Sequence, residues 1–332
     1  MINPGEEDGA PVWVLLGPRT GDNNQLLRLA SELGLPTRTI ELQYNALHVV
    51  PPALLGATLA TLTEQSRQLI RPPWPKLVLG IGYRSVPAAL AIRSMSKGST
   101  KLVRLGNPRM DASNFDLVIT TPQYAVHEAA NVVRLPLGIS TAGVVEPNRE
   151  ETEWLAKLPR PHRLLLIGGD SFMWTLAPAK VARAASTLAG KGPGSVIAVS
   201  SGRSAKAVLD AVAASLNGTE HALVWGRFPR YPVLLRDADE IYVTADSVAM
   251  VSDAIATGKP VGLVMPEKNA SGRIFYGLEQ FGFPLPVRDI RRFWTSMISQ
   301  GLAGTLEKPV AGKMAVDPLA QALTAVRSIK DS

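Results

Sequence analysis

Short apolar runs alternate with amphipathic segments along both halves of the chain, and this alternation is the feature that most constrains the fold. The runs are apolar throughout instead of at every second position, as in Leu77–Ile81 and Val261–Val264. Such runs are typical of strands in a sheet that helices cover on both faces. Strands separated by helices imply parallel βαβ crossovers. We therefore predict an α/β fold in which two Rossmann-like domains face a central cleft.

The first half is predicted to form one of these domains. Its strands are expected at Val12–Gly17, Thr39–Leu42, Leu77–Ile81, Lys101–Leu105 and Leu117–Thr120, and its helices at Gln25–Leu33, Pro51–Ile70 and Pro87–Ser94. Gly34 occupies the position of a helix C-cap glycine, and Pro36 follows it as an ordinary stop signal.

The second half repeats the pattern after an interruption. Around Thr141–Glu153 the sequence turns to Gly, Pro, Asn and Glu, which indicates a linker. Strands are then expected at Arg163–Ile167, Ser195–Ser200, His221–Trp225, Glu240–Thr244 and Val261–Val264, and helices at Leu176–Leu188, Ser204–Leu216, Tyr231–Asp237 and Ser247–Thr257. We therefore expect an N-terminal domain at 1–145 and a C-terminal domain at 155–310.

A terminal helix is predicted within residues 311–332. It covers Asp317–Ile329, with Asp317 as N-cap and Pro318 at the first helical position. Its apolar residues lie on one face, which suits packing back on the N-terminal domain.

The composition excludes several kinds of site. The chain has no cysteine, so disulfides and thiolate metal sites are excluded. Its four histidines (His48, His127, His162 and His221) include no pair at the i, i+4 spacing of a helical metal site. We expect these histidines at surface or capping positions, and we expect no metal and no bound cofactor.

The start of the chain lacks the basic and apolar regions of a secretory signal, and no apolar run reaches the roughly 20 residues that cross a bilayer. A cytoplasmic protein is therefore expected. The 35 Lys and Arg outnumber the 28 Asp and Glu, but they form no long basic block, which argues against a nucleic-acid partner. Weak attraction to anionic lipid at the inner face of a membrane, or to an anionic ligand, stays open. The oligomeric state is not predicted.

Ligands of open parallel sheets bind beyond the carboxyl ends of the strands, so the loops there are the candidate sites. The loop Gly168-Gly169-Asp170-Ser171 directly follows an expected strand. Its glycines would let the backbone approach an anion, and amides at the next helix N-terminus could donate to phosphate oxygens. The alternative is a tight turn that only needs positive φ. The loop is not a P-loop, because the GxxxxGK[ST] spacing is absent.

Two further loops of the second half carry polar side chains. Asp246 is a natural N-cap for a helix that Ser247 opens, and Gly258 closes that helix. Asp253 lies within the helix, where it could accept both hydroxyls of a ribose or simply face solvent. Arg203 follows another strand and could bind a phosphate in a forked geometry or remain a solvated surface arginine.

The first half offers a loop rich in hydrogen-bond donors after its first strand. Its candidate residues are Arg19, Thr20, Gly21, Asp22, Asn23, Asn24 and Gln25. Arg84 and Arg109 follow two other strands of the same half. Together with Arg203 these arginines would make a cationic site that suits an anionic ligand.

At these residues the chain resembles the bacterial and plant proteins of the mitochondrial fission, or "elongated mitochondria", family. The resemblance covers nearly the whole chain. Its motifs are TGDNNQ (20–25), LVLGIGYRS (77–85), NPR (107–109), FDLVITT (115–121), LLIGGDS (165–171) and VTADSVAMVSDAIATGKPV (243–261), of which the last is the most specific.

That family is in turn similar to the GT-B glycosyltransferases, whose two Rossmann-like domains hold a nucleotide-sugar. DAIATGKP (253–260) is similar to the GT-B segment E-A-x-A-x-G-x-P. The resemblance implies that Asp253 binds ribose and that Gly168, Gly169 and Ser171 bind diphosphate. Two departures are an aspartate where glutamate is usual, and Asp22 where GT-B enzymes often carry a histidine base.

The leading functional hypothesis is a GT-B-type transferase that uses a nucleoside-diphosphate sugar and a lipid or envelope-glycan acceptor. Asp22 would be the general base, although it serves equally well as a helix N-cap. A second hypothesis is a non-catalytic nucleotide-sugar sensor or membrane-associated scaffold. A nucleotide-sugar epimerase ranks last, because we expect it to need a nicotinamide cofactor and a Tyr-x-x-x-Lys pair, and the chain has neither that pair nor GxGxxG.

Overall fold

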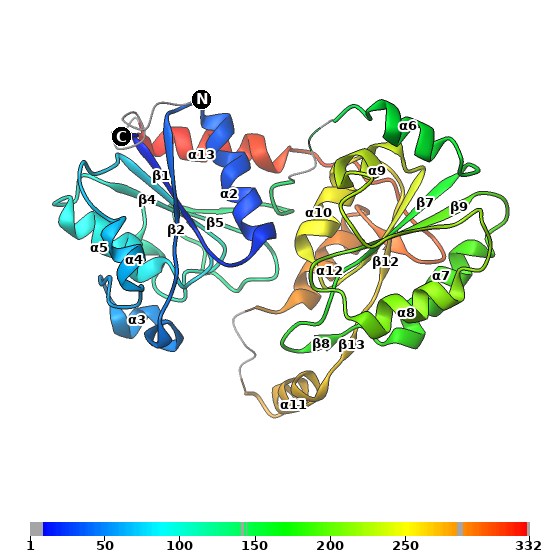
Figure 1. Ribbon diagram of the computed structural model, residues 1–332. Helices are drawn as coiled ribbons and strands as arrows, with labels where there is room; N and C mark the ends of the chain where they lie inside the picture. The colour runs from blue at the N-terminus through cyan, green and yellow to red at the C-terminus, as the bar shows by residue number, and fades with distance from the viewer. Residues whose placement is uncertain (1–8, 141–142, 144, 284–287, 331–332) are drawn as a thin grey trace. The chain divides into compact units, whose positions relative to one another are not determined.

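The computed structural model of the chain describes residues 9–140, 143, 145–283 and 288–330, and these residues divide into two compact units (Figure 1). The N-terminal unit consists of the described residues within Met1–Thr141, Val287–Asp289 and Val316–Ser332. The C-terminal unit consists of those within Ala142–Pro286 and Ile290–Ala315. Each unit is built on a six-stranded parallel sheet.

The sheet of the N-terminal unit has the order β2-β1-β3-β4-β5-β6. Its strands are β1 (Val12–Leu16), β2 (Thr37–Glu41), β3 (Leu77–Ile81), β4 (Lys101–Leu105), β5 (Leu117–Thr120) and β6 (Val132–Arg134). Its helices are α2 (Thr20–Leu33), α3 (Pro52–Leu55), α4 (Glu64–Gln68), α5 (Val86–Met95) and α13 (Pro318–Lys330), with short 3₁₀ turns at Ala46–Val49 and Ala112–Asn114. The order reverses between β1 and β3, which makes the carboxyl ends of these two strands a topological switch point.

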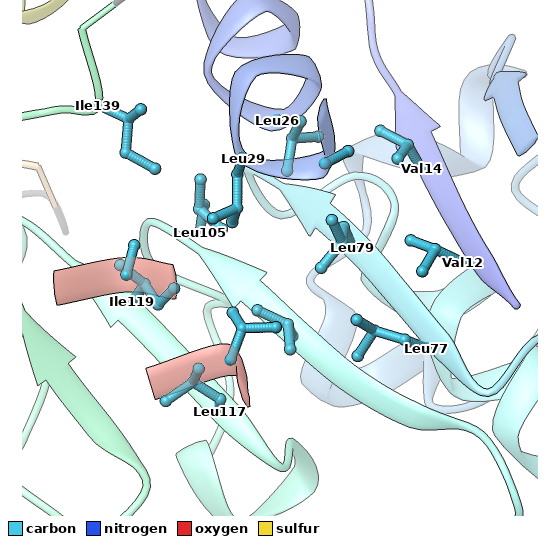
Figure 2. Close-up of a cluster of buried hydrophobic side chains, with 14 of the residues drawn as sticks. Val12, Val14, Leu26, Leu29, Leu77, Leu79, Leu105, Leu117, Ile119 and Ile139 are labelled. Atoms are coloured by element: carbon cyan, nitrogen blue, oxygen red, sulfur yellow. The ribbon is translucent and has the colours of Figure 1, made fainter. Parts of the chain in front are cut away.

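Alternate side chains of β1 enter two separate cores, one on each face of this sheet. Val12 and Val14 pack under α2, whereas Trp13 and Leu15 pack under α5. Figure 2 shows the first core, with Leu26 and Leu29 of α2 pointing toward the strands. Ala322 and Val326 of α13 complete that core. The predicted packing of the terminal helix on the N-terminal unit is therefore confirmed.

The sheet of the C-terminal unit has the order β10-β9-β7-β11-β12-β14. Its strands are β7 (His162–Ile167), β9 (Ser195–Ser200), β10 (Ala222–Val224), β11 (Glu240–Thr244), β12 (Val261–Val264) and β14 (Gly304–Thr305). Counted along the unit this order is 3-2-1-4-5-6, that of the doubly wound dinucleotide-binding fold, with its switch point between β7 and β11.

Helices cover both faces of this second sheet. α7 (Pro178–Ala189) and α8 (Lys206–Ser215) close one core, while α9 (Tyr231–Asp237) and α10 (Val248–Ala256) lie on the other side of the strands (Figure 1). The remaining elements are α6 (Arg149–Leu155), α11 (Ala270–Glu279), α12 (Ile290–Ser299) and a two-stranded antiparallel ribbon of β8 (Trp174–Thr175) and β13 (Glu267–Lys268). The α/β fold with two Rossmann-like parts is as the sequence predicts.

The single helix predicted over Pro51–Ile70 is wrong. The structure has the short helices α3 and α4 there instead. Gly56 ends the first with a φ of 61°, and the hydroxyl of Thr63 accepts a bond from the amide of Ser66 to begin the second. Local glycine and capping signals outweigh the apolar periodicity in this stretch.

Among the other boundaries, two differ most from the prediction. The helix expected from Gln25 begins at Thr20, so most of the expected loop forms its first two turns. The expected linker Thr141–Glu153 runs into α6, where Asn148 and Glu151 form a reciprocal capping box. Thr141, Ala142 and Val144 lie outside the described residues.

Among the residues that the structure describes, no helix combines the length and apolar character needed to cross a membrane.

Candidate functional site

Three strand ends meet at the switch point of the C-terminal unit. Gly168 and Gly169 follow β7, Arg203 and Ser204 follow β9, and Asp246 follows β11. The helix α10 begins at Val248, with Ser247 as its N-cap, so its positive end lies at the same edge of the sheet as Asp246. The position is the one where doubly wound sheets bind ligands.

The carboxylate of Asp246 is the centre of a hydrogen-bond network at this edge. It is fully buried and accepts bonds from the amide of Gly169 (3.0 Å) and the hydroxyl of Thr244 (2.7 Å). Arg203 Nη2 donates a third bond, at 3.0 Å. These three hydrogen bonds hold the buried carboxylate in place, and they join the loops that follow β7, β9 and β11. The predicted N-cap role of Asp246 is wrong, because Ser247 caps α10 through the amide of Met250.

Arg203 is fixed on one side and open on the other. Besides its bond to Asp246, its Nη1 donates to the carbonyls of Gly169 and Asp170, both at 3.3 Å. Its side chain is nevertheless 49% exposed. Arg203 is therefore neither a freely solvated arginine nor a buried one, since its guanidinium is held in place while part of it faces solvent.

Both glycines after β7 are required by packing within the protein. A Cβ on Gly168 would lie 2.3 Å from the carboxylate of Asp246, and one on Gly169 would lie 2.1 Å from the carbonyl oxygen of Arg203. Neither glycine has positive φ, so the alternative of a turn that needs positive φ is also wrong. The loops approach each other closely, and only glycine permits it.

The predicted use of this loop's amides needs correction. The amide of Gly168 donates to Thr244 Oγ1 at 2.7 Å, that of Gly169 donates to Asp246, and that of Ser171 donates to the carbonyl of Trp174. These three donors are already engaged inside the protein. The next segment is moreover β8, and α7 begins only at Pro178. Arg203 and the start of α10 are therefore the groups at this edge that can meet an anion.

Asp253 is buried on α10, which rules out the alternative of a solvent-facing carboxylate. The hydroxyl of Tyr231, at the start of α9, donates to Asp253 Oδ2 at 3.3 Å. Burial and the charge of Asp253 raise the pKa of Tyr231 well above its usual value, so the tyrosine remains a donor.

In the N-terminal unit, Asn23 braces the first loop. Its Oδ1 accepts a bond from the amide of Gly17 (2.9 Å) and its Nδ2 donates to the carbonyl of Gly17 (2.8 Å). Gln25 connects α2 to the segment after β6 by accepting a bond from the amide of Ile139 (3.2 Å). These two predicted site residues therefore hold the loop in shape.

The other candidates of that loop lie at its surface. Arg19, Thr20, Gly21 and Asn24 are exposed, and Asp22 is half-buried. Asp22 lies in the first turn of α2, and its alternative role as N-cap is wrong because that position belongs to Arg19.

Two predicted arginines follow β3 and β4. Arg84 is half-buried, whereas Arg109 is exposed, with its guanidinium carbon 3.8 Å from the ring centroid of Tyr83. Arg109 has a φ of 56°, and its amide donates to Asn107 Oδ1. This loop therefore presents a positioned cation at the carboxyl end of β4.

The sequence analysis missed Arg104, a buried arginine on β4. It pairs in register with Gly80 of β3, and its Nη1 occupies the space that a side chain at Gly80 would fill. It donates to Ser85 Oγ (2.9 Å) and to the carbonyl of Ile81 (3.0 Å), and among the described residues no carboxylate pairs with it. Burial lowers its pKa to about 9. An arginine inside an apolar run, opposite a glycine in the neighbouring run, is the signal that could have found it.

The prediction that all histidines lie at surface or capping positions is wrong for His162. This residue is buried on β7, where its ring bonds to the carboxylate of Asp237 and the carbonyl of Leu158. Burial lowers the pKa of His162, but the hydrogen bond that its ring donates to the carboxylate of Asp237 outweighs this, so the pKa is raised. No His, Asp or Glu cluster suited to a metal occurs among the described residues.

Comparison with known proteins gives a match over almost the whole chain. The sequence profile of the family described as mitochondrial fission ELM1 matches residues 20–330. An uncharacterized protein of Rickettsia prowazekii is 28% identical over 109 residues, which are 32% of this chain and 30% of that protein. The matched stretch therefore spans less than a third of this relative.

Several solved structures share the fold. A UDP-GlcNAc 2-epimerase from Neisseria meningitidis bound to UDP-GlcNAc has a TM-score of 0.52 at 11% identity, over 97% of this chain and 100% of that one. The Staphylococcus aureus protein MnaA with UDP gives 0.51 at 11%, over 95% and 90%. The Arabidopsis thaliana protein UGT89C1 gives 0.51 at 11%, over 97% and 98%. At these identities the likeness concerns the fold, which is GT-B-like.

Proposed function

The chain belongs to the mitochondrial fission ELM1 family, and from this premise we propose that it is a GT-B-type transferase that binds a nucleoside-diphosphate sugar at the C-terminal unit. The acceptor in this proposal is a lipid or an envelope glycan. The observation that carries the proposal is Arg203, a half-exposed guanidinium anchored by Asp246 at the switch point and beside the start of α10.

The diphosphate is proposed to bind Arg203 and the N-terminus of α10. A guanidinium that is already oriented loses little conformational entropy when it binds a phosphate in a forked geometry. The loop that holds Arg203 is shaped by Gly168, Gly169 and Ser171. The start of α10 is capped by Ser247. Stabilisation of the departing diphosphate by such fixed donors can proceed without a metal ion.

The ribose is proposed to bind at Asp253. Its carboxylate could accept the two ribose hydroxyls if Tyr231, which now donates to it, moves or shares the site. Two solved structures of the same fold contain UDP or UDP-GlcNAc, which supports a uridine nucleotide as the first ligand to test.

The acceptor is proposed to bind at the carboxyl edge of the N-terminal unit. Arg19, Thr20, Asn24, Arg84 and Arg109 are its candidate contacts. Asp22 is the candidate general base, because a half-buried carboxylate on the first turn of α2 could take the proton of an acceptor hydroxyl.

Nucleotide binding tests the first part of the proposal. We expect UDP or GDP to raise the melting temperature of the wild-type protein. Arg203→Met should weaken the affinity at least about tenfold, because one charge-assisted bond to the diphosphate is lost. Arg149→Met is the matched control, since Arg149 is an exposed arginine whose ion-pair partner is Glu153. If neither UDP nor GDP raises the melting temperature of the wild type, the proposal is refuted.

Two alternative functions, a non-catalytic sensor and an epimerase, differ from the proposed transferase in the product that forms. A non-catalytic sensor would bind nucleotide without turnover and be insensitive to Asp22→Asn. An epimerase would change the sugar of UDP-GlcNAc without an acceptor, which NMR of the nucleotide-sugar would detect. The shared fold of proteins named UDP-GlcNAc 2-epimerases favours testing this second activity.

A further inference from the structure

One region of the C-terminal unit exposes several large apolar side chains together. Ile274, Leu278 and Phe281 are spaced i, i+4 and i+7 along α11 and the turn after it, and all three are exposed. Ile274 is 62% exposed and Phe281 is 79% exposed. Residues at this spacing lie on one side of a helix. α11 therefore carries an apolar face outside the cores described above.

Two more aromatic residues extend this face. Phe172, in the loop before β8, is exposed and packs against Phe275, with the two rings tilted by 53° and their centroids 5.4 Å apart. Phe283 is exposed as well, and its amide donates to the carbonyl of Leu278. We call these six residues (Phe172, Ile274, Phe275, Leu278, Phe281 and Phe283) the α11 patch. Single exposed apolar residues are normal, but a contiguous group of this kind marks an interaction surface.

Cations border the α11 patch. Arg273 is exposed beside Ile274, and Lys268 and Arg291 lie over the ring of Tyr276, at 4.8 Å and 4.0 Å from its centroid. Glu279 is neutralised by Arg291, whose Nη2 lies 2.9 Å from its Oε1. Arg291 and Glu279 thus cancel each other, and Glu267 pairs with Lys180. Arg273 and Lys268 therefore leave a net positive charge beside the patch, as on the whole chain.

From this arrangement we propose that the α11 patch docks on a lipid bilayer that contains anionic headgroups. Apolar side chains on a helix face with Lys and Arg beside them suit the boundary between acyl chains and headgroups. A second copy of the chain fits less well, because a symmetric contact would bring the same cations against each other. Insertion of separate phenylalanines into lipid also needs no matching surface shape.

The α11 patch is joined directly to the candidate nucleotide site. Asn269 caps α11 through the amide of Gly272, and its Nδ2 donates to the carbonyls of Ser171 and Phe172, both at 3.1 Å. Ser171 and Phe172 continue the Gly168–Gly169 loop. A docked patch would thus hold this loop near the membrane surface. If the proposed transferase function is correct, on which this step rests, the acceptor is a membrane lipid.

Vesicle co-sedimentation without nucleotide tests the docking. We expect the wild type to bind vesicles of phosphatidylcholine mixed with phosphatidylglycerol, more weakly at high salt, and to bind pure phosphatidylcholine least. The double variant Ile274→Ser/Phe281→Ser should reduce the bound fraction at least about tenfold, because two exposed apolar side chains that would insert into the lipid are lost. Arg273→Glu should weaken binding to the anionic vesicles alone.

Leu54→Ser is the matched control, since Leu54 on α3 is 79% exposed, like Phe281, and lies in the other unit. It should bind vesicles as the wild type does. The docking proposal is overturned if the wild type fails to bind, if the double variant binds equally well, or if Leu54→Ser loses as much. If the wild type in solution had twice the mass of one chain and the double variant had the mass of one chain, the patch would bind a second copy instead. UDP affinity is measured separately from vesicle binding. If docking fails, the nucleotide proposal therefore still stands, and if UDP does not bind, the docking proposal still stands.

Discussion

Each unit places a glycine loop after the first strand of its sheet, but the two loops are supported differently. After β7, Gly168 and Gly169 are pressed against Asp246 and the backbone of Arg203. After β1, Gly17 has no atom within 4 Å of the place where a side chain would start, and the side chain of Asn23 holds it. The glycine loop of the C-terminal unit is thus tightly packed against other loops, whereas the space beside Gly17 in the N-terminal unit is empty. This difference suits a fixed site for a constant ligand and an adaptable one for a variable ligand.

The largest effect is expected from Gly169→Ala. Its methyl group would lie 2.1 Å from the carbonyl oxygen of Arg203, so one loop must move, and the unfolding free energy should fall by about 3 kcal/mol. Gly17→Ala has free space and should change it by less than about 0.5 kcal/mol. Urea unfolding followed by tryptophan fluorescence measures both. Equal losses would erase the contrast between the two loops.

Acid should affect the C-terminal unit next. The hydrogen bond from Arg230 to the buried Glu151 lowers the pKa of Glu151 to about 2, although burial opposes this. A carboxyl with a depressed pKa contributes stability that is present above its unfolded pKa of about 4.5 and is lost as the pH falls toward 2. Allowing for solvent around Arg230, we expect a loss of about 2 kcal/mol.

Unfolding curves between pH 6 and pH 3 (roughly the span of ordinary carboxyl titration) would measure this loss, and Glu151→Gln should remove most of it. The control is Glu153→Gln, in the same helix but exposed. If the Glu151→Gln variant keeps the full acid dependence, then the Glu151–Arg230 pair is not its source.

A smaller effect is expected at the proposed ribose site. Asp253→Asn keeps the shape of the side chain and removes the charge, so UDP affinity should fall about tenfold. Calorimetric titration measures it, with the exposed Asp210→Asn as control. On the same reasoning Asp22→Asn, in the other unit, should leave UDP affinity unchanged. A drop caused by Asp22→Asn and not by Asp253→Asn would reverse the assignment of the two edges.

The smallest effect concerns the brace of the N-terminal loop. Asn23→Ala removes two hydrogen bonds to Gly17 that are partly exposed to solvent, and we expect a loss of about 1 kcal/mol. Asn24→Ala, at an exposed neighbour, should have no measurable effect. If the unfolding free energies of Asn23→Ala and Asn24→Ala differ by less than the experimental error, Asn23 does not stabilise the loop.

Most strands of the two sheets were predictable because buried parallel strands leave a continuous apolar run, which Leu77–Ile81 and Val261–Val264 retain in the structure. The short edge strands β6 and β14 were not predicted. Elements held together by capping were not. The capping box of Asn148 and Glu151 lies in a stretch of polar residues that looks like a linker, and Gly56 interrupts a run that looks helical. The spacing of apolar residues predicts which residues are buried. It does not predict short elements that a few hydrogen bonds stabilise.

For the candidate site, the sequence indicates which residues follow neighbouring strands, but it does not indicate which hydrogen bonds join them. A sequence can indicate that Gly168, Arg203 and Asp246 follow neighbouring strands, because parallel topology brings strand ends to one edge. It cannot indicate that Asp246 bonds the amide of Gly169 and the guanidinium of Arg203, since these contacts join residues tens of positions apart. Arg104 escaped for the same reason, as its space is provided by Gly80 on another strand.

The packing of α13 has a consequence for biosynthesis. Ala322 and Val326 belong to the core between α2 and the first sheet, so that core stays incomplete until α13 has been translated. β1 and α2 must therefore wait for α13, whereas the C-terminal unit, which lies between them in the sequence, can fold first. A gene fragment encoding residues 1–145 alone should yield an aggregation-prone product, and adding the helix in trans as a peptide should rescue it.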